Sequence, residues 1–99
     1  MQIEIRSIHF KADKKLEDFI KEKLEKLTQF YDGVIGTEVS LKLSNTETSD
    51  NKITEIRMNV RGNDLYAKKQ SKTFEESTDE AVEALRRQLI KYKEKVRKI

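Results

Sequence analysis

The chain has 99 residues, of which 39% are charged and 35% apolar, with a formal net charge of +3 at pH 7. We expect one domain, residues 1–99, because this length supports one modest core and is too short for two. The absence of cysteine excludes disulfides and thiolate chemistry, and the N-terminus lacks the pattern of a signal peptide or membrane span, so we expect a cytoplasmic protein.

The N-terminal third predicts a strand followed by a helix. Apolar residues alternate from the N-terminus and change phase near Ser7, which indicates a bulge or the end of the strand there. Asp13 is the expected N-cap of a helix, and Gly33 is its expected stop. The apolar stripe of this helix recurs at steps of three and four, at Leu16, Phe19, Ile20, Leu24, Leu27 and Phe30 or Tyr31.

The middle of the chain predicts three more strands. Apolar and polar residues alternate over 37–43 and over 54–60, the pattern of half-buried strands, with a polar loop between them. A turn is expected at 62–64. A short strand over 65–70 then turns Leu65 and Ala67 inward, and Tyr66 is a candidate outward aromatic.

Residues 74–99 predict a long helix with a divided charge. Its apolar stripe consists of Phe74, Thr78, Ala81, Val82, Leu85, Leu89, Tyr92 and Val96. Residues 74–83 carry five acids and no base, whereas residues 84–99 carry seven bases and one acid. The helix dipole accounts for acids at the start and a base or two in the last turn, but not for seven bases over four turns.

The bases of this helix form a row. Arg87, Lys91 and Lys95 are spaced four apart and therefore line up over about 12 Å, while Arg86 and Lys93 lie on the other side of the apolar stripe. A bound polyanion would relieve the repulsion within the row. The alternative is a solvated lysine-rich face.

The element order β-α-β-β-β-α predicts an α+β fold. A two-layer sandwich buries the apolar faces of the half-buried strands and of the two amphipathic helices. In it, a four-stranded mixed sheet carries both helices on one face, as in double-stranded-RNA-binding domains. The first two strands should be parallel because a right-handed crossover joins them. Basic residues from both helices would line the groove between them.

The residues argue against catalysis. There is no cysteine and no glycine-rich phosphate loop, and the single histidine, His9, has no partner nearby in the sequence. The acids that open the last helix lack a calcium-binding pattern. We therefore expect no enzyme, no metal, no cofactor and no small-molecule substrate, which leaves a binding module.

Three segments resemble one family, the ribosome hibernation promoting factors, also called the ribosome-associated inhibitor or sigma-54 modulation family. They are KLEKLTQFYD over 23–32, VSLK over 39–42 and DEAVEALRRQLIK over 79–91. The resemblance covers nearly the whole chain, and the chain resembles the short form of the family. One departure is Thr73-Phe74-Glu75, where the family typically shows Asp-x-Tyr.

The resemblance implies a cytoplasmic stress-response protein that binds the small ribosomal subunit and its ribosomal RNA. Such proteins occupy the channel for messenger and transfer RNA and inhibit translation. The isolated protein is expected to be monomeric and to bind no membrane. The family's basic positions correspond here to Lys23, Lys26, Lys42, Arg87, Lys91 and Lys95, and local position adds Arg86 and Lys93 as RNA-binding candidates.

Two alternatives remain at this stage. One is a general binder of structured RNA. The other is a protein-interaction module whose charged helix docks on an acidic partner, with Tyr66 as a candidate hot spot.

Overall fold

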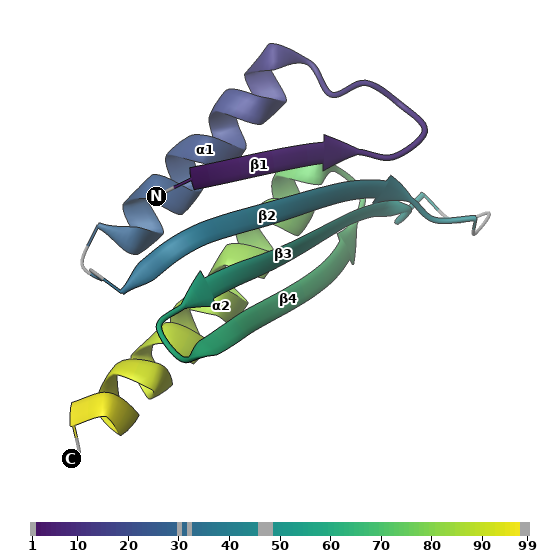
Figure 1. The fold of residues 1–99 in the computed structure, drawn as a ribbon. Helices are drawn as coiled ribbons and strands as arrows, with labels where there is room; N and C mark the ends of the chain where they lie inside the picture. The colour runs from purple at the N-terminus through teal and green to yellow at the C-terminus, as the bar shows by residue number, and fades with distance from the viewer. Residues whose placement is uncertain (1, 30, 32, 46–48, 98–99) are drawn as a thin grey trace.

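The computed structural model describes the whole chain except residues 1, 30, 32, 46–48, 98 and 99. Its elements follow the predicted order (Figure 1): β1 (Gln2–Ser7), α1 (Lys14–Thr28), β2 (Val34–Leu43), β3 (Lys52–Val60), β4 (Asn63–Ser71) and α2 (Phe74–Arg97). Among the described residues, no helix has the length and apolar character needed to cross a membrane.

The four strands form one mixed sheet in the order β1-β2-β3-β4. β1 pairs with β2 in parallel, and β2, β3 and β4 form an antiparallel meander. Both helices cover the same face of the sheet (Figure 1). The predicted two-layer α+β architecture is thus confirmed, including the parallel first pair.

The two helices run in the same direction, because each returns antiparallel to the strand before it. Near their N-terminal ends, the ring of Phe10 stacks on that of Phe74 with centroids 5.1 Å apart. The acidic start of α2 therefore lies at the end of the molecule where α1 also begins, and its basic half lies at the opposite end.

The core lies between the sheet and the helices. Burying these apolar side chains is the main favourable contribution to folding. The described buried side chains that pack as one cluster are Leu16, Ile20, Leu24, Leu27, Val39, Leu41, Ile56, Met58, Val60, Leu65, Ala67, Phe74, Ala81, Val82, Leu85 and Leu89.

A hydroxyl cluster joins β3 to α2 within this core. Thr54, Ser77 and Thr78 are fully buried. The hydroxyl oxygens of Thr54 and Ser77 are 2.6 Å apart, and the Ser77 hydroxyl also donates to the carbonyl oxygen of Phe74. Ser77 was not part of the predicted stripe. Its burial is tolerated because each buried hydroxyl has a hydrogen-bond partner.

A polar side chain caps the N-terminus of each helix. The Asp13 carboxylate accepts a hydrogen bond from the backbone N–H of Leu16 at 2.9 Å, as predicted. Thr73 caps α2 in the same way, accepting from the N–H of Glu76 at 3.0 Å. Thr73 therefore caps the helix with a hydroxyl at the position where the family typically has an acid.

The element ends differ modestly from the prediction. α1 ends at Thr28 and is followed by Gln29 as its C-cap, so the helix stops before Tyr31 and Gly33. Phe30 lies outside the described residues. β2 and β3 begin three and two residues earlier than the alternation indicated, at Val34 and Lys52, because main-chain pairing continues past the alternating segments.

A tight hairpin joins β3 to β4. Val60 pairs with Asn63, so Arg61 and Gly62 form the loop, and Gly62 has a φ of 78°. That left-handed conformation favours glycine at this turn position. The last turns of α2 extend beyond this end of the sheet (Figure 1).

Candidate nucleic-acid interface

The eight predicted RNA-binding residues occupy three separate places on the molecule. On the helical wheel, Lys23 and Lys26 of α1 face α2, and Arg86 and Lys93 of α2 face α1. Arg87, Lys91 and Lys95 lie on the other side of α2, which we call the outer flank. Lys42 lies on the sheet face that carries no helix, which we call the open sheet face.

The bases between the helices are already engaged with other protein groups. Lys23 forms an ion pair with Asp79 at 3.1 Å, which links α1 to α2. Lys26 pairs with Glu22 at 3.3 Å, and Arg86 with Glu83 at 3.3 Å. The Lys93 ammonium lies over the ring of Tyr31, 5.2 Å from its centroid. Three of the four bases in the predicted groove are therefore paired with a carboxylate of the protein, whereas Lys93 rests against an aromatic ring and keeps its charge.

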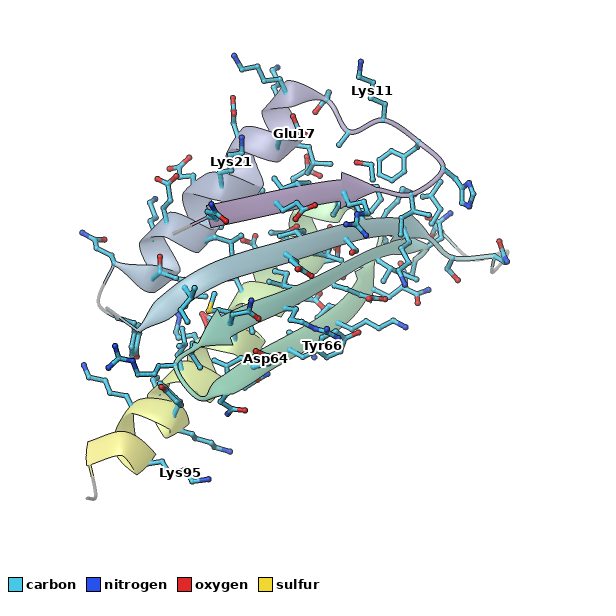
Figure 2. All side chains as sticks on the ribbon, viewed as in Figure 1. Lys11, Glu17, Lys21, Asp64, Tyr66 and Lys95 are labelled. Atoms are coloured by element: carbon cyan, nitrogen blue, oxygen red, sulfur yellow. The ribbon has the colours of Figure 1, made fainter. Side chains whose placement is uncertain are left out.

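The outer flank differs because its bases are exposed and have no ion-pair partner in the described part of the chain. Arg87, Lys91 and Lys95 form no ion pair with any carboxylate that the structure describes. Figure 2 shows Lys95 on the part of α2 that extends past the sheet. The row spans about 12 Å at 1.5 Å of rise per residue. It presents three free positive charges along one line.

Gln88 links α2 to β4 beside this flank. Its side-chain amide donates to the carbonyl oxygen of Tyr66 at 2.7 Å and accepts from the backbone N–H of Tyr66 at 3.2 Å. This pairing ties the helix to the free edge of β4. Because Lys91 and Lys95 lie on the same side of the helix as Gln88, they are held along that edge.

The acidic half of α2 bounds the outer flank at its other end. Arg87 borders a shallow hollow of about 290 Å³ that is also lined by Lys69, Asp79, Glu80 and Glu83. No cluster of acids or histidines among the described residues is arranged to hold a metal ion. The hollow therefore marks the boundary at which the surface of α2 changes from acidic to basic.

Lys42 is not brought together with the helix bases. Its ammonium contacts the Glu55 carboxylate at 2.6 Å, and Lys68 approaches the same carboxylate at 3.8 Å. The hydrogen bond to Glu55 and the charge of Glu55 raise the pKa of Lys42. Burial alone would raise the pKa of Glu55, but the hydrogen bond and charge of Lys42 outweigh it and hold that pKa below its usual value.

The open sheet face as a whole is balanced in charge. The strand register places on it four acids (Glu4, Glu38, Glu55, Asp64) and four bases (Arg6, Lys42, Arg57, Lys68). Tyr66 points outward from this face and is 46% exposed (Figure 2). Burial and the nearby Glu55 carboxylate raise the pKa of Tyr66. A neutral face of this kind attracts a polyanion far less than the outer flank does.

Two residues that support the site had no assigned role in the sequence interpretation. Gln88 belongs to the quoted helix motif, but only the fold shows that its amide meets the edge of β4. Tyr92 is part of the predicted stripe, and its hydroxyl donates to the carbonyl oxygen of Arg61 at 2.6 Å. The sequence signal is a polar side chain beside the apolar stripe for Gln88, and a hydroxyl on an aromatic residue within the stripe for Tyr92.

Together, the fold and the outer flank define a small α+β protein with a row of exposed bases on its C-terminal helix. The chain belongs to the family described as "Sigma 54 modulation protein / S30EA ribosomal protein", whose sequence model matches residues 3–97. The family resemblance seen in the three sequence segments is thereby confirmed.

Similar proteins cover nearly the whole chain. The ribosome hibernation promoting factor of Escherichia coli K12 is 29% identical over 98 residues, which is 98% of each chain. That of Klebsiella oxytoca is 26% identical over 97 residues and also covers 98% of each chain. The protein of the same name from Pseudomonas putida KT2440 is 25% identical over 95 residues, 96% of this chain and 89% of its own.

Two solved structures share the fold. A ribosomal subunit interface protein from Coxiella burnetii superposes with a TM-score of 0.84 over 94% of this chain and 98% of its own, at 19% identity. The N-terminal domain of Thermus thermophilus Protein Y superposes with a TM-score of 0.80 over 93% and 99%, at 20% identity.

Proposed function

We propose that this chain is a ribosome hibernation factor. It binds the small ribosomal subunit through the basic half of α2, occupies the channel for messenger and transfer RNA, and thereby inhibits translation in the cytoplasm under stress or in stationary phase. Family membership supports this role, as do relatives named ribosome hibernation promoting factor that align over nearly their full length.

The observation that carries the proposal is the unpaired row on the outer flank. Arg87, Lys91 and Lys95 are exposed, and they meet no described carboxylate. Binding a phosphate there displaces only water and counterions, so no protein ion pair has to break. The rigid α2 holds the three charges in register along about 12 Å.

The bases between the helices would make a second, more costly contact. Lys23, Lys26 and Arg86 would each have to exchange a carboxylate for a phosphate oxygen. Such an exchange conserves the charge-assisted hydrogen bond but leaves a carboxylate near the RNA. These residues therefore contribute less net affinity than the outer flank. Lys42 stays with Glu55 on the open sheet face.

Selectivity in this proposal comes from shape. Phosphate contacts supply affinity without reading sequence, and folded RNA is recognised mainly by the form of its grooves and single-stranded regions. The projecting end of α2 and the rigid sheet behind it form a narrow wedge, with overall dimensions of 48 × 24 × 18 Å. A monomer suffices for such a plug.

The proposal is tested by sedimentation of the purified protein with separated ribosomal subunits at 50 and 200 mM salt. We expect comigration with the small subunit at low salt and its loss at high salt. The double variant Arg87→Glu/Lys91→Glu should stay at the top of the gradient. The control Arg6→Glu/Arg57→Glu changes net charge equally on the open sheet face and should still comigrate.

The alternatives are separated in the same experiment. If an arbitrary RNA duplex displaces the protein as readily as unlabelled subunits do, the chain is a general binder of structured RNA. If the complex survives ribonuclease, it is held by a protein partner. Failure to comigrate with the small subunit at low salt contradicts the proposed function.

A further inference from the structure

The β3–β4 hairpin is held firmly against the end of α2. The Tyr92 hydroxyl donates to the carbonyl oxygen of Arg61 at 2.6 Å. The backbone N–H of Arg61 donates to the carbonyl oxygen of Gly33 at 3.2 Å. Nearby, the Lys93 ammonium lies 5.2 Å from the centre of the Tyr31 ring. Three segments distant in sequence thus meet at one end of the molecule.

The Arg61 side chain at this junction is exposed and has no ion-pair partner among the residues that the structure describes. Val60, just before it, is buried in the core, whereas Arg61 is exposed. Its guanidinium forms no ion pair with any carboxylate in the described part of the chain. The backbone of Arg61 is held by two hydrogen bonds. Its side chain makes no described ion pair that would stabilise the fold.

The backbone of Arg61 lies against the basic half of α2. Its carbonyl is bound by Tyr92, which is one residue after Lys91 and three before Lys95. Lys91 and Lys95 are on the side of α2 that faces β4, and Arg61 leads into β4 through the hairpin. The basic surface therefore continues from α2 onto a second element.

We propose that Arg61 is a further phosphate-binding residue, which acts with the basic half of α2 on the same RNA. Tyr92 is the positioning residue that holds the hairpin against the helix. This inference rests on the proposed ribosome binding. The surface it defines spans two elements, the β3–β4 hairpin and α2, in place of a single row on one helix.

Arginine suits this task better than the neighbouring lysines do. Its planar guanidinium binds a phosphate through two parallel hydrogen bonds, which fixes the direction of the contact. Because the hairpin backbone is already anchored, binding immobilises only the side chain, and the entropic cost of the contact is reduced. Arg61 would thus set the angle at which α2 lies on the RNA.

The test is the salt dependence of binding to small ribosomal subunits for Arg61→Gln. We expect the slope of log K against log salt to become shallower by about 0.7–0.9, the value of one phosphate contact. The matched control is Arg57→Gln, which removes an exposed arginine from the open sheet face of β3. It should leave the slope unchanged.

The variant Tyr92→Phe tests the positioning role. It deletes only the hydroxyl that binds the Arg61 carbonyl, so we expect a smaller effect of Arg61→Gln in that background than in the wild type. Equal slopes for Arg61→Gln and Arg57→Gln, with wild-type binding intact, would overturn this inference alone. If the wild type binds no subunits, both the proposed function and the inference about Arg61 are wrong.

Discussion

Removing the charges of the outer flank should measure how much of the binding is electrostatic. The triple variant Arg87→Gln/Lys91→Gln/Lys95→Gln removes three charges that pair with no described carboxylate. At a slope of about 0.7–0.9 per contact, it should make the dependence of log K on log salt shallower by about 2–3. Between 50 and 200 mM salt, the wild type should therefore lose roughly 20- to 40-fold more affinity than the triple variant.

The assay is fluorescence anisotropy of labelled protein titrated with small ribosomal subunits at four salt concentrations. The matched variant is Lys23→Gln/Lys26→Gln/Arg86→Gln, which removes the same charge from bases paired with Asp79, Glu22 and Glu83. Since those bases have carboxylate partners within the protein, its slope should change less. A larger change for this second variant than for the first would refute the reasoning, because the paired bases would then be the main contacts.

Three further predictions concern stability. Leu85→Ala empties a fully buried site in the core and should lower the free energy of unfolding by about 2–5 kcal/mol in a denaturant titration. Thr54→Val leaves the Ser77 hydroxyl bound only to the Phe74 carbonyl, and should cost about 1 kcal/mol, visible as a fall in melting temperature of about 4–8 °C. No loss in either variant would contradict the packing described. Because the pKa of Glu55 is lowered below its ordinary 4.5 in the folded state, its stabilising contribution is present above that pH and is lost as pH falls through the lowered value. The stability difference between the wild type and Glu55→Gln should therefore shrink as pH is lowered from 6 to 3, and a difference that stays constant would rule out the Lys42–Glu55 pair as its source.

Much of the fold follows from periodicity in the sequence. The helix stripes, the alternating strands and the crossover rule together give the sheet order and the face that the helices cover. The first and last residues of the elements are predicted less well. β2 starts at Val34 because main-chain pairing with β3 extends the strand across a bulge between Val34 and Gly36, and no side-chain alternation marks that stretch.

The candidate site is harder to predict, because ion pairing depends on contacts between distant segments. Lys23 and Asp79 are far apart in sequence and meet only because the two helices run in the same direction. The alternation places Lys42 on the face away from the helices, but it does not show that Lys42 pairs with Glu55 of the next strand. The row of Arg87, Lys91 and Lys95 is visible in the sequence, since one helix generates it.

The place of Arg61 also could not be predicted from the sequence. In the sequence it is an isolated base before a glycine, the composition of many exposed turns. Its place against the basic half of α2 depends on the hydrogen bond between Tyr92 and the hairpin, which joins residues 31 positions apart. Only the folded chain brings these groups together.

The central claim is that the α2 side of the molecule faces ribosomal RNA and the open sheet face does not. The chain has no cysteine, so a single one can be introduced and tethered to an iron chelate that generates hydroxyl radicals. We would place it at Glu94→Cys on α2 and at Ser40→Cys on the open sheet face. With the protein bound to small subunits, strong cleavage of the ribosomal RNA from position 94 and weak cleavage from position 40 is the predicted result. Stronger cleavage from position 40 would contradict the account.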